Sequence, residues 1–376
     1  MTALTKPEDT TVAVTGADGF IGSNLMIRLA EQGYAARPIT RRTADAVARS
    51  ALAESDVVLH LAGTNRPGDP AEFMRSNRDF AAGVAQAVAD GGRCPLIIYA
   101  SSVKVEDDSE YGRSKLAGEA AMLTLADRGL ARVLIHRLPN VFGKWARPNY
   151  NSAVATFCHN LARGLPIRID DPRASLSLLY IDDLADQWID LISAPGAASG
   201  MVASRHVHHS TVGAVADQIR AFAEGRERGE VGPVSGGLAR ALHATFVSAL
   251  PSPSFSYSLE AHVDQRGSFT EFVRTANSGQ VAFLTAHPGV TRGGHYHHSK
   301  VEKFLIVHGE ALFRFRHLLT GETHEIRTSA SQPVVVETIP GWTHDVTNTG
   351  GAVMVAFVWA NETFDPERPD TVAMPL

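Results

Sequence analysis

Three shortages narrow the class of protein before any motif is considered. The 376 residues include only two cysteines, Cys94 and Cys158, too few for a disulfide framework or a thiolate metal site, which favours a reducing compartment. The 35 basic and 40 acidic side chains give a net charge of −5, so the chain lacks the basic surplus typical of nucleic-acid binding. The chain also lacks a basic-then-apolar signal pattern at its start and the ~18 uncharged apolar residues of a membrane span. We expect a cytoplasmic protein that binds neither nucleic acid nor membrane.

The chain does have the composition of a folded globular protein. It is 44% apolar and 20% charged, with 32 glycines and 19 prolines, which excludes disorder, collagen-like repeats and coiled coil. Its length exceeds the size of an average domain and favours two domains.

Short apolar runs alternate with helix-like segments over the first 140 residues. The run TVAVTG (11–16) precedes the helical pattern IGSNLMIRLAEQG (21–33), which ends in a glycine suited to a helix C-terminus. Further apolar or β-branched runs lie at 36–40, 56–61, 95–100 and 132–137. Strands that alternate with helices predict an α/β fold with a doubly wound, parallel Rossmann sheet.

The pattern changes after about residue 245. The segment SALPSPSFSYS (248–258) has two prolines and five serines, which indicates a linker. Short alternating β-rich runs follow, punctuated by glycines, and predict an antiparallel all-β barrel or sandwich. We therefore expect a dinucleotide-binding domain at 1–247, a linker at 248–258 and an all-β domain at 259–376.

A glycine-rich turn follows the first predicted strand. The sequence GADGFIG spans Gly16, Gly19, Phe20, Ile21 and Gly22 and leads into the first helix, where glycines allow the backbone to approach a pyrophosphate. A tight turn without a ligand is the alternative. The position between strand and helix favours the cofactor site.

The end of the second predicted strand favours NADPH over NADH. The sequence PITRR has no acidic residue for the ribose hydroxyls of NADH, and it offers Arg41 and Arg42 to a 2′-phosphate. Two arginines on a solvated loop are the alternative interpretation.

A tyrosine and a lysine lie four residues apart, on one face of a predicted helix. A cationic Lys115 beside Tyr111 is expected to lower the pKa of the phenol toward the useful acid–base range. Ser101 and Ser102 lie just past the strand PLIIYA, at the carboxyl edge of the sheet, where a hydroxyl can polarise a carbonyl. The order of these groups predicts a proton-donating catalytic site.

Together these motifs resemble the extended short-chain dehydrogenase/reductase family, which acts on nucleotide sugars. The resemblance implies that Ser102, Tyr111 and Lys115 are catalytic, with Tyr111 and Lys115 also contacting the cofactor. It further implies that DVVLHLAG (56–63), with Leu61 and Ala62, lies under the adenosine ribose, and that LPNVFG (138–143), with Asn140, contacts the nicotinamide and the substrate.

The most specific pattern in the chain is a set of histidines with a carboxylate. His295 and His297 alternate along a predicted strand and point the same way, Glu302 adds a carboxylate, and His344 comes from a later strand. Three imidazoles and one carboxylate suit Zn²⁺, Fe²⁺, Mn²⁺ or Ni²⁺. His298 faces the other way. The alternative for a single His-x-His pair is that both histidines lie on the surface or in the core and bind no ligand.

This pattern resembles both motifs of the cupin family, which implies a double-stranded β-helix that holds a divalent ion, with Zn²⁺ as our expectation. In sugar-modifying cupins a 4-keto nucleotide sugar is epimerised next to its ketone. The candidates for acid–base residues near the ion are His298, Lys303 and Tyr296.

The whole chain resembles bifunctional capsular-polysaccharide enzymes that join a reductase to a metal cupin. The resemblance implies a homodimer that epimerises C3 of a UDP-linked 4-keto-6-deoxy-N-acetylhexosamine and then reduces the C4 ketone with NADPH. The product would be UDP-2-acetamido-2,6-dideoxy-L-talose, on the route to UDP-N-acetyl-L-fucosamine.

Three other hypotheses stay open at this point. One is a single-site NADP-dependent nucleotide-sugar reductase or epimerase whose cupin is a structural or dimerisation module. The second is a non-enzymatic redox sensor, against which the complete Ser, Tyr and Lys set argues. The third is an Fe²⁺ oxygenase.

Overall fold

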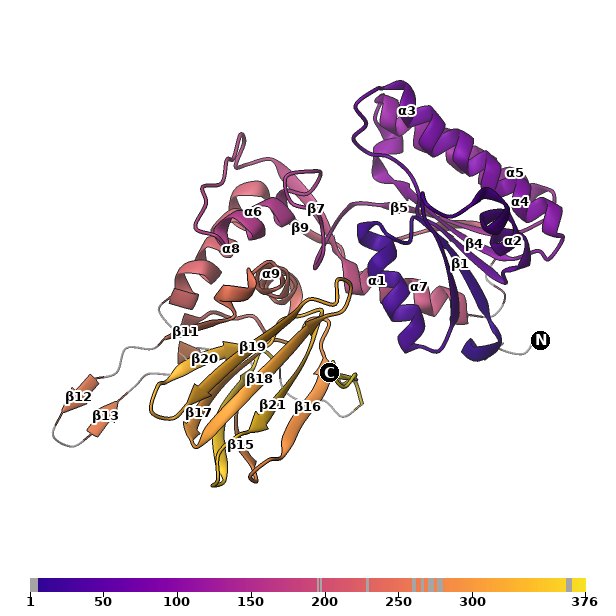
Figure 1. Ribbon diagram of the computed structural model, residues 1–376. Coiled ribbons are helices and arrows are strands. Elements are labelled where there is room, and N and C mark those ends of the chain that lie inside the picture. Colours follow the sequence, from indigo (N-terminus) through magenta and orange to yellow (C-terminus); the bar gives the residue numbers. More distant parts are fainter. Residues whose placement is uncertain are drawn as a thin grey trace. The chain divides into compact units, whose positions relative to one another are not determined.

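The computed structural model describes residues 6–194, 196, 198–227, 230–258, 262–264, 267–269, 274–275, 280–362 and 367–376, with side chains left undescribed between 259 and 283. The chain divides into two compact units, Met1–Val141 with Ser177–Val207, and Phe142–Leu176 with His208–Leu376 (Figure 1). Residues 142–176 therefore belong to the same unit as the C-terminal half of the chain. The sequence-based domain boundaries at 248–258 stay a prediction.

The first unit is built on a six-stranded sheet in the order β2-β1-β3-β4-β5-β8, in which every pair of neighbours is parallel. The strands are β1 (Thr11–Thr15), β2 (Ala35–Ile39), β3 (Val57–His60), β4 (Leu96–Ser102), β5 (Arg132–Leu138) and β8 (Gly200–Val202). Strands β3 and β4 are buried at every position, as expected for a parallel sheet covered on both faces. The predicted Rossmann fold is confirmed.

Helices cover both faces of this sheet. Figure 1 shows α2, α4 and α5 stacked on one side and α1 with α7 on the other. The helices of this unit are α1 (Phe20–Glu31), α2 (Asp45–Glu54), α3 (Ala71–Phe73), α4 (Phe80–Gly91), α5 (Glu110–Asp127) and α7 (Ile181–Ser193). A π-helical turn, Met74–Asp79, leads into α4, and a 3₁₀ turn, Val103–Glu106, follows β4.

The C-terminal part of the second unit is all-β. Two five-stranded sheets have the orders β11-β20-β17-β22-β15 and β19-β18-β21-β16-β23, and their neighbours pair antiparallel. Their strands are β11 (Ser256–Ser258), β15 (Gln280–Ala286), β16 (Thr291–Tyr296), β17 (Glu302–His308), β18 (Glu310–His317), β19 (Thr323–Ser329), β20 (Val334–Glu337), β21 (Trp342–Asn348), β22 (Met354–Ala360) and β23 (Val372–Ala373). This is the antiparallel all-β architecture expected after residue 259.

Helices and short strands complete the second unit. They are α6 (Ala153–Leu161), β9 (His208–Thr211), α8 (Val212–Glu227), β10 (Glu230–Val231), α9 (Gly237–Ser248), β12 (His262–Asp264), β13 (Gly267–Phe269) and β14 (Arg274–Thr275). Two further strands, β6 (Asn140–Phe142) and β7 (Ser175–Tyr180), cross the boundary between the units. Helices α6, α8 and α9 pack against one another.

The segment 248–258, which the sequence predicts as a linker, contains a short strand. Its last three residues form β11, which pairs with β20 as an edge strand. The physical reason is Phe255, which is fully buried and packs edge-on against Phe315 and Trp342, with ring centroids 5.7 and 5.1 Å away. A free linker would expose this ring.

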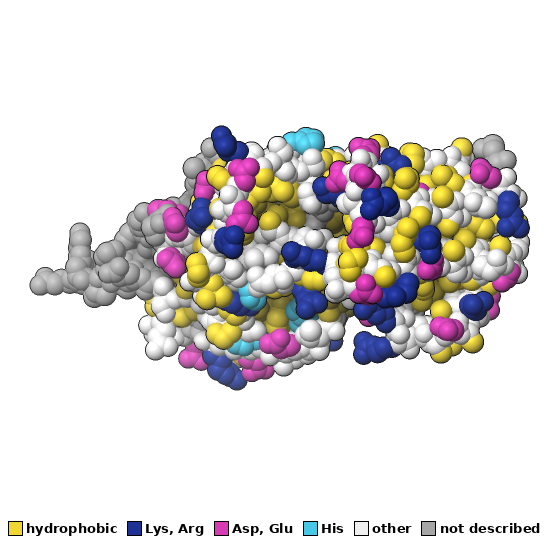
Figure 2. Space-filling view, turned by 90° about the horizontal axis from the view of Figure 1, so that it is seen from above, with side chains coloured by type: hydrophobic (Ala, Val, Ile, Leu, Met, Phe, Trp, Pro, Cys, Tyr) yellow, Lys and Arg dark blue, Asp and Glu magenta, His cyan; other side chains and the backbone are white. Residues whose placement is uncertain are grey.

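The surface carries charges of both signs, as the small net charge of the sequence predicts. Basic and acidic side chains are interspersed on the face of the described residues that Figure 2 shows. Within the described part of the chain, no helix has both the length and the apolar character to cross a bilayer.

Two helical glycines provide a matched test of this packing. A Cβ on Gly22 of α1 would lie 2.1 Å from the Gly16 carbonyl oxygen, whereas a Cβ on Gly83 of α4 would meet no atom within 4 Å. We expect Gly22→Ala to lower the free energy of unfolding by about 1–3 kcal/mol through overpacking. Gly83→Ala should raise it by about 0.5–1 kcal/mol. Urea unfolding followed by circular dichroism measures both, and equal effects would contradict the close approach of α1 to the turn.

Candidate functional site

The glycine turn between β1 and α1 has the geometry of an open anion site. Gly16 has a φ of +70°, which favours glycine, and its carbonyl oxygen accepts a hydrogen bond from the Gly19 N–H at 3.0 Å. Helix α1 then begins at Phe20 and Ile21, so its unpaired N–H groups lie directly after the turn. Gly22 permits the closest approach of the helix to Gly16.

The end of β3 packs against this turn. The Thr15 hydroxyl lies 2.7 Å from His60 Nδ1 and accepts hydrogen bonds from the backbone N–H groups of Leu61 and Ala62, at 3.1 and 3.2 Å. A Cβ on Gly16 would lie 3.0 Å from the Ala62 backbone. Burial lowers the pKa of His60 to about 3, so its ring is neutral. The structure thus brings the predicted cofactor residues of both loops together.

Three further predicted cofactor residues, Arg41, Arg42 and Asn140, are exposed. Arg41 and Arg42 follow the end of β2, the strand next to β1, and the Arg42 N–H donates to the Thr40 hydroxyl at 3.2 Å. Asn140 is exposed at the start of β6. The side chains of Arg41, Arg42 and Asn140 are therefore accessible to a ligand.

Ser102 and Tyr111 meet at the carboxyl edge of the sheet. Ser102 ends β4, and the Ser109 hydroxyl caps α5 by accepting the Gly112 N–H at 3.0 Å, which places Tyr111 in the first turn. The Ser102 and Tyr111 hydroxyls are hydrogen-bonded. Burial raises the pKa of Tyr111, and the hydrogen bond to Ser102 opposes that rise.

Lys115 acts differently from the sequence-based expectation. Its Nζ donates to the Ala100 carbonyl oxygen at 2.6 Å and lies 4.7 Å from the centroid of the Tyr99 ring. Burial lowers the pKa of Lys115 itself to about 8, partly offset by Glu119. The expected lowering of the Tyr111 pKa by Lys115 is wrong for this structure, because burial of the phenol dominates and the amine is directed to a carbonyl.

Strand alternation distinguishes the two candidate serines. Ser101 points to the opposite face from Ser102, and its hydroxyl donates to Glu119. Glu119 also accepts two hydrogen bonds from Arg137, at 3.0 and 2.8 Å. Ser101 is therefore part of a buried polar network, and Ser102 alone faces the tyrosine.

Sequence reasoning missed Asn77. Its Oδ1 accepts the Thr64 N–H at 3.1 Å, while its Nδ2 donates to the Thr64 carbonyl at 3.1 Å and to the Ser114 hydroxyl at 2.9 Å. Asn77 thus ties the loop after β3 to the helix that carries Tyr111 and Lys115. The sequence has no local signal for it, because its partners lie 13 and 37 residues away.

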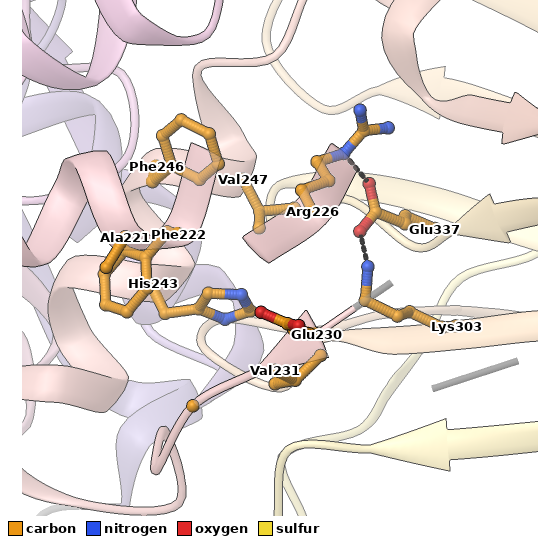
Figure 3. Close-up of a pocket in the computed structure, with 11 residues that line it drawn as sticks. Ala221, Phe222, Arg226, Glu230, Val231, His243, Phe246, Val247, Lys303 and Glu337 are labelled. Atoms are coloured by element: carbon orange, nitrogen blue, oxygen red, sulfur yellow. Dashed lines mark hydrogen bonds and ion pairs between the residues drawn. The ribbon is translucent and has the colours of Figure 1, made fainter. Parts of the chain in front are cut away.

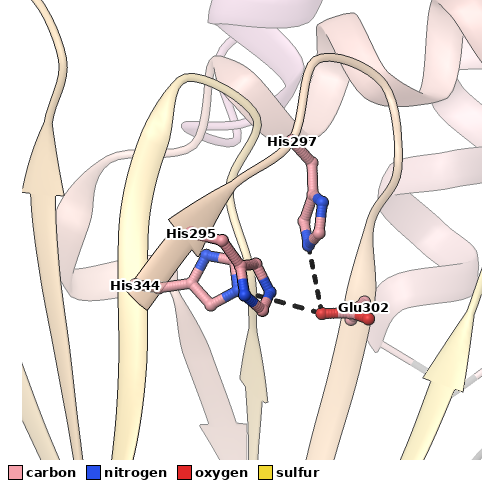
Figure 4. Close-up of side chains that lie close together, drawn as sticks. All are labelled: His295, His297, Glu302 and His344. Carbon is pink, nitrogen blue, oxygen red and sulfur yellow. Dashed lines mark hydrogen bonds and ion pairs between the residues drawn. The ribbon is translucent and has the colours of Figure 1, made fainter. Parts of the chain in front are cut away.

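The second unit holds a cluster of four possible metal ligands. His295 of β16 pairs across the sheet with His344 of β21, His297 follows β16, and Glu302 begins β17. One ligand atom from each residue lies within 4.8 Å of the others, and the four side chains converge (Figure 4). Glu302 Oε2 lies 3.2 Å from His297 Nε2 and 3.8 Å from His344 Nε2.

The chemistry of these residues fits a divalent cation. Within the described residues, both ring nitrogens of the buried His344 lack a hydrogen-bond partner. Burial, then His344 and His297, lower the pKa of His295 to about 4. Burial alone would raise the pKa of the Glu302 carboxyl, but His297, His344 and Lys300 hold it well below its ordinary value. Neutral imidazoles and an ionised carboxylate are the forms that bind such ions.

The expected acid–base residues do not face this cluster. His298 packs its ring against Tyr296, with centroids 5.5 Å apart, on the other face of the chain from His295 and His297. Lys303 follows Glu302 in β17 and so points to the opposite side of the sheet. There it forms an ion pair with Glu337, a buried carboxylate.

The contacts of Lys303 are structural. Glu337 also accepts a hydrogen bond from Arg226 of α8 at 2.7 Å, so the carboxylate joins this helix to the sheet (Figure 3). The adjoining pocket beside His243 is small, with room for about one water molecule.

Comparison with known proteins gives relatives for both halves. Residues 12–200 match the NAD dependent epimerase/dehydratase family, and residues 262–372 match the polysaccharide biosynthesis C-terminal domain. The UDP-2-acetamido-2,6-beta-L-arabino-hexul-4-ose reductase of Pseudomonas aeruginosa is 47% identical over 363 residues, which cover 96% of this chain and 98% of that protein.

Solved structures match the whole chain or a part of it. The capsular polysaccharide assembling protein CapF from Staphylococcus aureus matches with a TM-score of 0.67 and 37% identity, over 97% of this chain and 100% of that one. The Bordetella bronchiseptica enzyme WbmF, in complex with NAD⁺, matches with a TM-score of 0.52 and 20% identity, over 58% of this chain and 80% of that one. The second likeness concerns the fold alone.

The two adjacent serines allow a matched test of the proton donor. We expect Ser102→Ala to raise the pKa of Tyr111 further, because the hydrogen bond that opposes the effect of burial is lost. Ser101→Ala should leave the Tyr111 titration unchanged, since Ser101 contacts Glu119. Absorbance titration of tyrosinate, with Tyr111→Phe as the difference reference, measures the shift. An equal shift in both variants would contradict the assignment of Ser102.

Proposed function

Because the chain belongs to the NAD-dependent epimerase/dehydratase family, we propose that it is a bifunctional nucleotide-sugar enzyme that epimerises C3 and reduces C4 of a UDP-linked 4-keto-6-deoxy-N-acetylhexosamine. The resemblance to a capsular-polysaccharide enzyme, expected from the sequence, is confirmed over 97% of the chain. The observation that carries the proposal is a half-buried cluster of three histidines and a glutamate, in addition to a Ser102–Tyr111 pair on a different structural unit.

The first unit carries the reductase chemistry. Bound NADPH would supply the hydride for the C4 ketone. Tyr111 donates its proton to the C4 oxygen, and Ser102, already hydrogen-bonded to the phenol, holds the carbonyl oxygen in line. The high pKa that burial gives Tyr111 keeps the phenol protonated at neutral pH, which suits a proton donor. Lys115 would hold the nicotinamide ribose, as the resemblance to the short-chain dehydrogenase/reductase family implies.

The second unit carries the epimerisation. A divalent ion held by His295, His297, Glu302 and His344 would polarise the C4 ketone and acidify the C3–H bond. The four residues bring three imidazoles and one carboxylate to a single point, and their partial exposure at His295 and Glu302 leaves an approach for a ligand. Zn²⁺ is the ion that we propose.

The order of the two steps follows from the chemistry of the ketone. A ketone at C4 acidifies the hydrogen at C3, so epimerisation requires the ketone to be intact. Reduction removes this activation and preserves the new configuration. The product that we propose is UDP-2-acetamido-2,6-dideoxy-L-talose, and the name of the Pseudomonas aeruginosa relative, a reductase of a UDP-linked hexul-4-ose, supports a 4-keto substrate. The homodimer and the cytoplasmic location stay predictions.

Exchange with solvent deuterium separates the two activities. In D₂O, the enzyme with the UDP-linked 4-keto sugar should place deuterium at C3 before NADPH is added, and reduction should follow its addition. Tyr111→Phe should lower reduction by about 10²–10⁴-fold and keep the exchange, because only the proton donor is lost. NMR of the sugar measures both steps.

Variants of the metal cluster complete this experiment. His295→Ala should remove bound zinc and the exchange at C3, whereas His298→Gln, a matched change of the neighbouring histidine, should keep both. Metal content is measured on the same samples. Reduction without exchange in the wild-type protein would show that the all-β domain is a structural module. Exchange at C3 in metal-free protein would show that the ion has only a structural role.

The preference for NADPH over NADH tests whether Arg41 and Arg42 bind the 2′-phosphate. We expect the double change Arg41→Ala and Arg42→Ala to raise the KM for NADPH roughly tenfold or more, because a charge-assisted contact to phosphate contributes about 1.5–3 kcal/mol. The KM for NADH should change little. Arg49→Ala, an exposed arginine on α2, is the control. Equal effects on the two cofactors would contradict a 2′-phosphate site at these residues.

A further inference from the structure

The last residues of the chain contact every segment that carries a ligand of the metal cluster. Strand β23 pairs with β16 at His295, and the Met374 N–H donates to the Gly294 carbonyl at 2.7 Å. The Thr343 hydroxyl, next to His344, donates to the Met374 carbonyl. We call residues 370–375 the C-terminal strap.

Asp370 holds the turn between two of the ligands. Its Oδ1 accepts the His298 N–H at 2.8 Å, and its Oδ2 accepts the Ser299 N–H, the Ser299 hydroxyl and the Lys300 N–H at 2.7, 2.9 and 2.6 Å. Four donors converge on one carboxylate, which favours its ionised form. These hydrogen bonds set the path of the backbone from His297 to Glu302.

The backbone of Asp370 also determines which nitrogen of His297 is available. The Asp370 carbonyl oxygen is hydrogen-bonded to His297 Nδ1, and a carbonyl only accepts, so Nδ1 carries a hydrogen. His297 Nε2 then faces Glu302 and is the nitrogen that can bind an ion. A hydrogen bond of this kind to a metal-binding histidine orients the ring and raises its basicity.

The side chain and the carbonyl of one residue therefore act on the same ligand loop. The strap also holds Lys300, whose Nζ donates to the Thr371 hydroxyl at 2.9 Å and lies 3.5 Å from Glu302. A single residue at the end of the chain controls the backbone, the ring orientation and the tautomer of a ligand 73 residues away.

We propose that Asp370 is a positioning residue of the metal cluster, which fixes the turn 297–300 and the Nδ1–H tautomer of His297, so that the affinity for the ion depends on the C-terminal strap. This inference rests on the metal site of the proposed function. It adds a residue that does not bind the ion itself.

Asp370→Asn is the primary test. The amide replaces one acceptor oxygen with an NH₂ group, which cannot accept the N–H donors of Ser299 and Lys300. We expect a 10- to 100-fold loss of Zn²⁺ affinity, the range for contacts that orient a metal ligand. The full-length metal-free protein is titrated with Zn²⁺ in competition with a chromogenic chelator. Glu310→Gln, an exposed carboxylate on β18, is the matched control and should bind Zn²⁺ as the wild type does.

A spectroscopic readout separates positioning from general stability. The ¹⁵N signals of the His297 ring report which nitrogen carries the hydrogen. Asp370→Asn keeps the Asp370 carbonyl but weakens the side-chain hydrogen bonds that hold it against the turn. We therefore expect the wild-type pattern of Nδ1–H to be lost or averaged in this variant. If that variant does not fold, Ser299→Ala, which removes one of the hydrogen bonds to Asp370, should still lower Zn²⁺ affinity several-fold.

The outcomes are distinct. The role of Asp370 would be overturned if Asp370→Asn bound Zn²⁺ within twofold of the wild-type affinity and kept the wild-type His297 signals. If Asp370→Asn does not fold, unchanged Zn²⁺ affinity in Ser299→Ala would overturn it. If the wild-type protein itself bound no Zn²⁺, the metal site of the proposed function would fail instead.

Discussion

Successive side chains of a β-strand point to opposite faces of the sheet, and both candidate sites depend on this constraint. In β4 it turns Ser102 toward Tyr111 and Ser101 toward the buried Glu119. In β17 it turns Glu302 toward the histidines and Lys303 toward Glu337 on the other side. A register shift of one residue in either strand would exchange these roles and remove the site.

Burial determines the charge state of each site. Around Tyr111 it raises the pKa of the phenol and lowers that of Lys115, so that the tyrosine keeps its proton. Around His295 it keeps the imidazole neutral, while the neighbouring histidines and Lys300 keep Glu302 ionised. The same loss of water therefore favours a proton donor in one unit and a set of metal ligands in the other.

Hydrogen bonds from distant residues hold both sites in place. Asn77 joins the loop after β3 to the helix of Tyr111, and Asp370 joins the end of the chain to the turn after His297. Neither residue belongs to a local motif. Both use buried or nearly buried polar groups, and most of their partners are backbone groups or short side chains, which makes the geometry rigid.

The sequence by itself was sufficient for the Rossmann sheet, the antiparallel all-β half and the four-residue cluster, because these depend on local periodicity and on ligand spacing along strands. Only the tertiary structure showed that Phe255 draws the expected linker into a sheet, that Lys115 is directed to the Ala100 carbonyl, and that His298 and Lys303 face away from the cluster. The physical reason is that burial and long-range hydrogen bonds are set by contacts between segments far apart in the chain. A residue type and its spacing predict which chemistry is possible, and packing decides which way each side chain points and which protons it keeps.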